Sequence, residues 1–115
     1  MAVFSSNLII YKHTDFEQTF VLEDSQSNRA KDLTGFTGSC KMQRTLNLGS
    51  LTAFNLSFTN RALGKLRISL TNAQTAALRT GRHVYDIELS FNDSSGNTIV
   101  ERILEGRIQV TPQVT

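Results

Sequence analysis

Two histidines are the first residues of this chain to consider for metal binding or catalysis. His13 and His83 stand far apart in the sequence, without a set of Cys or carboxylate residues at ligand spacing around them. A metal site needs three or four ligands that converge. The pattern therefore favours two ordinary polar histidines, and it predicts neither a metal site nor another cofactor.

A nucleophilic triad could in principle be assembled from Ser90, His83 and Asp86. However, the surrounding segment alternates apolar and polar residues like a β-strand, in which neighbouring side chains point to opposite faces. The sequence also contains no Gly-x-Ser-x-Gly elbow. It contains neither of two phosphate-binding motifs, Gly-x-Gly-x-x-Gly and Gly-Lys-Ser/Thr. We therefore expect no catalytic residues, and a protein that is not an enzyme.

The oxygen-bearing residues Asp93, Ser95 and Asn97 stand at alternating positions, with Glu101 further along, and resemble part of a calcium-binding loop. A working loop needs more carboxylates than one Asp and one distant Glu. The segment 92–97 is also rich in residues that favour turns, including Gly96. We interpret it as the polar tip of a β-hairpin.

A nucleic-acid interface is the alternative function that the charges allow. The chain has 12 Lys and Arg against 10 Asp and Glu, a net charge of only +2, and its basic residues are scattered. The alternation places Lys41 on the outward face of one predicted strand, and Lys65 and Arg67 on the outward face of another. These residues would form a basic strip if the two strands were neighbours. The exposed aromatic residues that would stack on bases are missing there, which favours an ordinary solvated sheet face.

The size and composition are those of one soluble domain. A chain of 115 residues matches the usual size of a single domain, and we assign residues 1–115 to it, with extended tails at 1–6 and 111–115. The single Cys40 excludes an internal disulfide and fits synthesis in a reducing compartment. No apolar run approaches the roughly 18 residues that cross a bilayer. We therefore expect synthesis in the cytoplasm, without membrane association.

The strongest structural pattern is a long hairpin at the C-terminal end. Alternating residues predict a strand at 82–91 with one buried face, the loop at 92–97, and a return strand at 98–110. In the return strand we expect Leu104, Ile108 and Val110 on the inner face, and Glu101 and Ile103 on the outer face. Gly106 lies among the inner residues, which predicts a bulge or a close approach of backbone there.

Shorter strands fill the rest of the chain. Leu8–Tyr11 is a continuous apolar run that should be covered on both faces, and Thr71 with Gln74 forms a capping box for a short helix near 72–79 that ends at Gly81. Further strands are predicted at 16–22, 29–32, 36–46, 52–58 and 65–70, with a hairpin loop at Glu23–Asn28 and a corner at Asp32–Phe36.

Seven or eight short strands separated by turns predict an all-β fold, an antiparallel β-sandwich with immunoglobulin-like or Greek-key connections, with a small β-barrel as the alternative. The predicted core includes Phe54, Phe58, Tyr85 and Leu89. The two ends are the predicted contact surface. Val3 and Phe4 are apolar and lie outside any clear strand, and Pro112 cannot join a ladder, so Val110–Thr115 should leave the domain extended, with Val110 and Val114 available to a partner.

Four segments together resemble small virion proteins of tailed bacteriophages. They are Asp15–Phe20, Asp32–Thr37 (Asp-Leu-Thr-Gly-Phe-Thr), Gly81–Leu89, and the ending Gly106–Thr115, in which Gly-x-Ile-x-Val-x-Pro-x-Val-Thr can be read. The similarity covers nearly the whole chain. It is to the immunoglobulin-like modules of tail, baseplate and fibre-base proteins, such as the N-terminal domain of baseplate upper proteins.

This resemblance implies a structural subunit of the virion, made in the cytoplasm of the bacterial host. Its partners would be other virion proteins of the tail, neck, fibre or capsid, in several symmetric copies. Such a module commonly heads a longer chain in the family, whereas this one stops at Thr115. That difference favours a stand-alone adaptor in the tail or neck, or a decoration protein on the capsid, and the resemblance supplies no catalytic residues.

Overall fold

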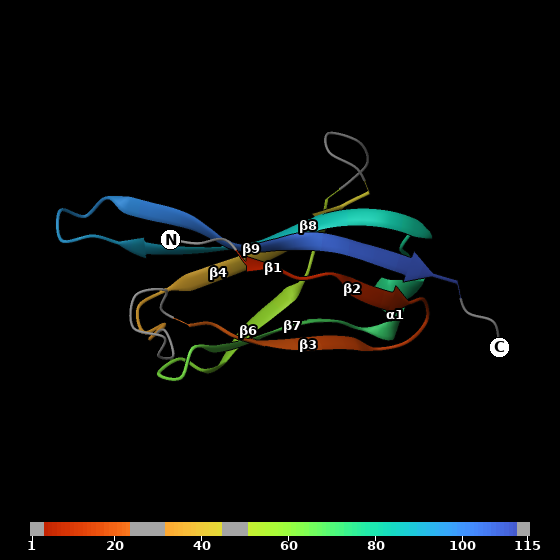
Figure 1. Cartoon of the computed structure of the whole chain (residues 1–115), viewed down its shortest axis with the longest axis horizontal. Helices are drawn as coiled ribbons and strands as arrows, with labels where there is room; N and C mark the ends of the chain where they lie inside the picture. Colours follow the sequence, from red (N-terminus) through yellow and green to blue (C-terminus); the bar gives the residue numbers. More distant parts are fainter. Residues whose placement is uncertain (1–3, 24–31, 45–50, 113–115) are drawn as a thin grey trace.

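The structure is a computed structural model, which describes residues 4–23, 32–44 and 51–112. These residues form nine strands and one short helix (Figure 1). The elements are β1 (Phe4–Ser5), β2 (Leu8–Tyr11), β3 (Phe16–Val21), β4 (Thr37–Gln43), β5 (Thr52–Ala53), β6 (Asn55–Asn60), β7 (Lys65–Leu70), α1 (Asn72–Ala76), β8 (Gly81–Asn92) and β9 (Thr98–Thr111).

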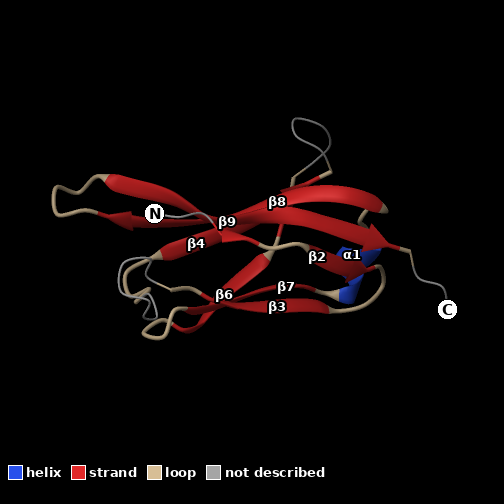
Figure 2. Ribbon diagram, in the orientation of Figure 1, coloured by secondary structure: helices blue, strands red, loops and turns tan. Residues whose placement is uncertain are grey.

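The strands form two sheets that face each other, so the predicted all-β sandwich is confirmed (Figure 2). The larger sheet has the order β1-β9-β8-β4-β5, with β2 also paired to β9, and the smaller sheet has the order β3-β7-β6. The prediction of purely antiparallel pairing is wrong at one edge, because β1 and β2 both run parallel to β9. At 14 residues, β9 is long enough to hold both short strands along the edge that β8 leaves open.

The core lies between the two sheets. Tyr85, Leu89 and Phe54 are buried, and Phe58 is partly buried against the same cluster, which confirms the predicted core. Phe54 stands between β5, which pairs with β4, and β6, which pairs with β7. The single alternating run predicted at 52–58 is therefore divided between the two sheets, and Phe54 lies where the chain crosses from one to the other.

A bulge in β9 changes the predicted faces of its first half. Ile87 pairs with Leu104 and Glu88 pairs with Arg102, which leaves Ile103 as an extra residue. Consequently Ile103 and Leu104 are both buried, and the prediction of an outward Ile103 is wrong. Glu101, also expected outside, lies opposite the buried Leu89, and its Oε2 is buried without a hydrogen-bond partner.

The predicted corner and helix cap are confirmed. Asp32 Oδ1 accepts hydrogen bonds from the backbone N–H and the hydroxyl of Thr34, and Gly35 has a positive φ of 84°. Thr71 and Gln74 form the expected capping box at the start of α1. The helix is shorter than predicted, since its C-cap is Ala77, and Gly81 is instead the first residue of β8. As expected, α1 links a strand of the smaller sheet to a strand of the larger one.

Strand β2 is covered on one face only. Ile10 is fully buried opposite Val110, whereas Ile9 and Tyr11 are exposed. The prediction of a strand covered on both faces is therefore wrong for the described chain. Residues 29–31 of the predicted strand at 29–32 and most of the loop Glu23–Asn28 fall outside the described residues, as do Val3 and Val114.

Candidate interaction surface

The residues of the possible triad are not brought together. His83 is buried on the inner face of β8, where its Nε2 lies 2.9 Å from the carbonyl oxygen of Arg79. Asp86 and Ser90 lie on the opposite face because they have the other parity. The Ser90 hydroxyl is 2.6 Å from that of Thr37 on the neighbouring strand. This serine is therefore part of a cross-strand hydroxyl pair.

The tip of the β8–β9 hairpin uses its oxygen atoms for its own turn. Asp93 Oδ1 accepts hydrogen bonds from the backbone N–H groups of Ser95 and Asn97, both at 2.9 Å. The backbone of Asp93 exchanges further bonds with Asn97 and Gly96. This geometry confirms a polar hairpin tip. In the part of the chain that the structure describes, no three His, Cys, Asp or Glu side chains are grouped to hold a metal ion.

The proposed basic strip does not form. Lys41 lies on β4 of the larger sheet, whereas Lys65 and Arg67 lie on β7 of the smaller sheet. The guanidinium of Arg67 is 3.9 Å from the carboxylate of Glu17. The separation removes the observation on which the nucleic-acid alternative depended. Among the described residues, no helix is long and apolar enough to span a membrane.

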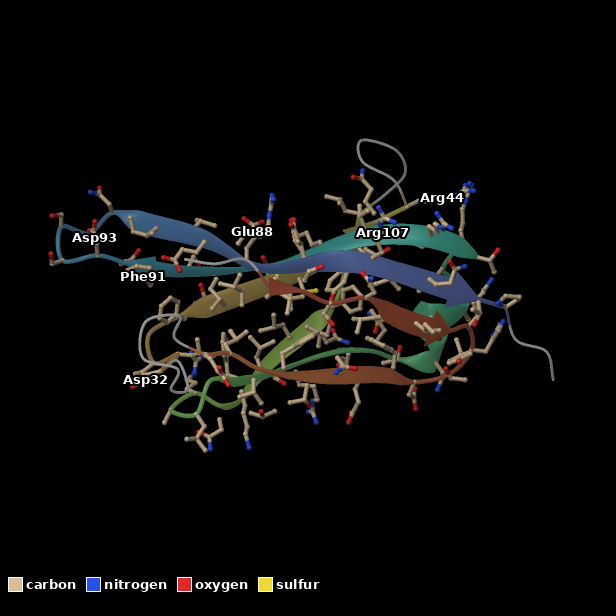
Figure 3. All side chains as sticks on the ribbon, viewed as in Figure 1. Asp32, Arg44, Glu88, Phe91, Asp93 and Arg107 are labelled. Carbon is tan, nitrogen blue, oxygen red and sulfur yellow. The ribbon has the colours of Figure 1, made fainter. Side chains whose placement is uncertain are left out.

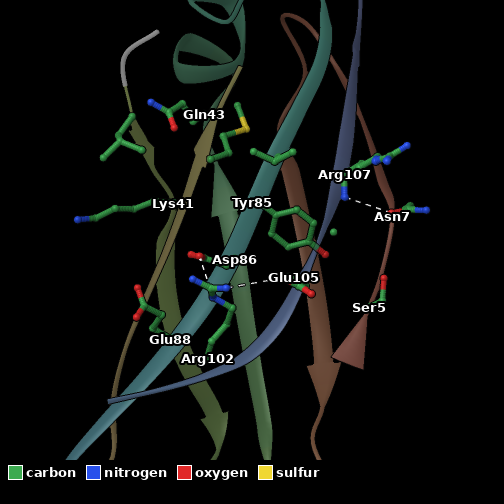
Figure 4. Close-up of a pocket in the computed structure, with 14 residues that line it drawn as sticks. Ser5, Asn7, Lys41, Gln43, Tyr85, Asp86, Glu88, Arg102, Glu105 and Arg107 are labelled. Carbon is green, nitrogen blue, oxygen red and sulfur yellow. Dashed lines mark hydrogen bonds and ion pairs between the residues drawn. The ribbon is translucent and has the colours of Figure 1, made fainter. Parts of the chain in front are cut away.

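The outer face of the larger sheet carries polar and charged side chains, among them Glu88 and Arg107 (Figure 3). It contains a depression of ≈ 730 Å³ that lies over β4, β8 and β9, with the start of the chain along one side (Figure 4). Its lining includes Lys41, Gln43, Asp86, Glu88, Arg102, Glu105 and Arg107.

Charges of both signs alternate within this depression. The Arg102 Nε is 3.3 Å from the carboxylate of Asp86, and its Nη1 is 3.8 Å from that of Glu105 (Figure 4). Lys41 stands opposite Asp86 in the pairing of β4 with β8. An open face with interleaved acids and bases suits contact with another protein better than contact with a polyanion.

The edge of the depression is built by a close approach of the N-terminal segment to β9. A Cβ on Gly106 would lie 1.9 Å from the carbonyl oxygen of Ser6 and 3.0 Å from the ring of Tyr85. The Tyr85 hydroxyl donates a hydrogen bond of 2.7 Å to that same oxygen. The close backbone approach predicted at Gly106 is therefore confirmed, although the bulge lies at Ile103.

Burial raises the pKa values of two side chains that lie beneath this face, Tyr85 and Cys40. It raises the pKa of the Tyr85 hydroxyl from 10.0 to about 12. It also raises the pKa of the Cys40 thiol from 9.0 to about 12, with a further contribution from the negative charge of Asp86. Cys40 is thus an unreactive core thiol.

The predicted contact residues have different surroundings. Val110 is fully buried in the core of its own chain, so its side chain cannot reach a partner, and including it in the contact surface was wrong. Phe4 belongs to β1, where its backbone lies beside Leu104. The prediction that Phe4 lies outside the strands is therefore wrong. Pro112 is exposed directly after β9.

Sequence reasoning missed other exposed apolar residues. Ile9 and Tyr11 on β2 and Val100 on β9 are exposed. The continuous apolar run at Leu8–Tyr11 was the available sign, because in a two-sheet sandwich the opposite sheet covers only one face of each strand. Val100 could not have been found in this way, since its orientation depends on the bulge.

A similar fold occurs in a phage protein. A solved structure described as the N-terminal domain of phage TP901-1 ORF48 matches with a TM-score of 0.54, covering 95% of this chain and 84% of that one. The sequences are 14% identical, so the similarity shows a shared fold. No protein-family model matches the sequence, and no curated protein matches it.

Proposed function

We propose that this chain is a structural, non-enzymatic subunit of a tailed-phage particle. It acts by protein–protein contact in the tail, baseplate or neck, in fibre attachment, or as a decoration of the capsid. The observation that carries the proposal is the fold shared with a phage protein domain over 95% of the chain. This agrees with the virion-protein resemblance of the four sequence segments.

The surface supports a contact function. The outer face of the larger sheet combines interleaved charges with exposed apolar residues at its two ends. Such a mixture is typical of protein interfaces. The proposed contact residues are Val3, Phe4, Pro112 and Val114 from the ends of the chain, together with Ile9, Tyr11 and Val100.

Mass spectrometry of purified particles tests the proposal. In particles of a phage that encodes this chain, the protein should be present at a fixed ratio to the major structural proteins, and it should remain after a high-salt wash and nuclease treatment. Its absence from particles would refute the proposed function. A gel-shift titration at two salt concentrations is the companion measurement, because tight binding of nucleic acid that weakens steeply with salt would support the alternative function instead.

A further inference from the structure

The β8–β9 hairpin projects beyond the rest of the sandwich as an arm, defined here as residues 90–101. The pairing of β4 with β8 ends at Thr37 and Ser90, and beyond it β8 and β9 pair with each other alone. Figure 1 shows the arm as the extension at one end of the molecule. With a rise of about 3.4 Å per residue, it reaches roughly 10 Å past that last pair.

The tip of the arm is preorganised for contact. The bonds that Asp93 makes to Ser95, Gly96 and Asn97 fix the turn. The Thr98 hydroxyl donates a bond of 3.0 Å to Asn92 Oδ1 across the hairpin. A rigid projection loses little conformational entropy when it docks.

The arm and the opposite end of the larger sheet carry charges of opposite sign. The arm contains Asp93 and Glu101 and neither Lys nor Arg, and Glu101 has a buried carboxylate oxygen with no hydrogen-bond partner. The opposite end, where β2 and β9 finish and β8 begins, contains Lys12, Arg79 and Arg82; we call it the basic end. Its acidic neighbour Asp15 accepts two hydrogen bonds from Asn72 at the start of α1.

These charges are well separated. The molecule measures 50 × 27 × 21 Å along its principal axes, and Figure 3 shows Asp93 at the tip of the arm, whereas the basic end lies at the far ends of β8 and β9. At physiological salt, charges further apart than about 8 Å are largely screened from each other. The two ends therefore interact with partners independently.

Apolar side chains accompany the charges at both ends. Val100 on the arm is 57% exposed, and it pairs with Ser90 on the outer face. At the basic end Ile9 and Tyr11 are 55% and 58% exposed, and Ile9 lies beside Gln109 on the same outer face of the sheet. Each end thus offers an exposed apolar contact, and Arg102, the next outward residue after Val100, is already paired with Asp86 and Glu105.

We propose that the arm of one copy of this chain docks on the basic end of a second copy, with Val100 placed against Ile9 and Tyr11. Charge complementarity identifies the second copy as the occupant, because the chain carries both halves of the contact. Two different patches meet in such a contact, so it is head-to-tail and propagates into a ring or a helical row. The inference extends the proposed function by naming a partner for the subunit.

Sedimentation of the purified full-length chain tests this contact. Association should increase with protein concentration at about 50 mM salt, and its Kd should rise at least tenfold at about 500 mM. Val100→Lys should give a monomer, because it replaces the apolar contact with a charge that the basic end repels. The matched control is Val21→Lys, since Val21 is 56% exposed on a strand of the other sheet; it should associate like the parent. Melting curves confirm that each variant is folded.

A mixing experiment distinguishes head-to-tail contact from other modes. The double variant Tyr11→Ser, Arg82→Ser should also be monomeric, because its basic end is impaired while its arm is intact. Mixed with Val100→Lys, it should form a one-to-one dimer that grows no further, since one good arm meets one good basic end. A parent chain that stays monomeric at low salt, or a mixture that stays monomeric, overturns the inference. If the purified chain is monomeric but mass spectrometry still finds it in particles, this inference fails and the proposed function is retained.

Discussion

At the scale of single residues, Gly106 controls how the start of the chain joins the sheet. Any side chain there would collide with the backbone carbonyl of Ser6, which cannot move without displacing β1. Gly106→Ala should therefore lower the free energy of unfolding by about 2–3 kcal/mol or more, measured by urea denaturation.

The matched control for this substitution is Gly38→Ala. A Cβ at Gly38 would come within 3.1 Å of the terminal methyl groups of Leu56 and Leu89, which can adjust. The cost there should be smaller. Equal costs for the two variants would show that the contact between Gly106 and Ser6 does not constrain the fold.

Tyr85 should make stability fall in alkaline solution. Its pKa rises from 10.0 to about 12 on folding, and that of Cys40 rises from 9.0 to about 12. The folded state therefore holds these protons to higher pH than the unfolded chain does. Their contribution is fully present below about pH 9 and is lost as the pH rises towards 12.

Urea denaturation of the parent and of Tyr85→Phe across pH 8–12 measures this effect. The variant should lose about 1 kcal/mol at pH 8, because the Ser6 carbonyl loses the bond that the hydroxyl donates. Above pH 10 the free energy of unfolding of the variant should fall less steeply than that of the parent, because Cys40 is the only one of these two groups that the variant still has. Parallel curves for the two proteins would contradict a buried, protonated Tyr85.

At the scale of elements, alternation identified most strands because one face of each is buried. It gave β3, β4, β7 and β8 nearly to their ends. It failed where three-dimensional pairing decides the orientation. The inserted residue Ile103 reverses the faces of β9 before it, and no local pattern marks a bulge when both neighbouring residues are apolar.

The division of the run at 52–58 has a similar origin. Its alternation is continuous through Phe54, although the chain leaves one sheet there and joins the other. Hydrophobic spacing records which residues are buried, and it does not record against which strand they pack. The parallel pairing of β2 with β9 was hidden for the same reason, since about a hundred residues separate the partners.

Phe54 should be the most sensitive point of the crossover between sheets. It is 7% exposed and its ring packs edge-on against that of Phe16, with centroids 6.1 Å apart. Phe54→Ala should cost about 3–5 kcal/mol, enough to unfold much of a marginally stable domain. The control Leu51→Ala removes an exposed side chain nearby and should change stability by less than about 0.5 kcal/mol. A melting temperature of Phe54→Ala within a few degrees of the parent would contradict its place in the core.

At the scale of the whole molecule, the candidate surface was the least predictable feature. The alternation places Asp86, Glu88 and Arg107 outside, but the depression and its ion pairs depend on the order β9-β8-β4, which brings strands from distant parts of the chain together. Likewise, the basic end becomes visible only when the start of the chain is placed beside its last strand. The arm, in contrast, is part of the hairpin that the sequence predicts.

The same placement changes what truncation of the chain should do. Removing residues 1–6 deletes β1 and the Ser6 carbonyl that Tyr85 binds, so this deletion should destabilise the domain. The extended tail predicted at 1–6 from the sequence would instead have been removable without loss of the fold. Shorter deletions of 1–3 or 112–115 spare β1 and all of β9 through Thr111. If these ends serve contacts, as we propose, both short deletions should leave the melting temperature within a few degrees of the parent and strongly reduce incorporation into particles.

Quantitative mass spectrometry of particles grown with each truncated form measures incorporation, and thermal melting of the purified forms measures stability. The two readouts separate the roles, because loss of the 1–6 form from particles could follow from unfolding, whereas loss of a stable 1–3 or 112–115 form could not. Normal incorporation of both short deletions would exclude the chain ends from the contact surface. The contacts would then lie elsewhere, and the outer face of the larger sheet is the candidate, because both short deletions leave its charged depression, the arm and the basic end unchanged.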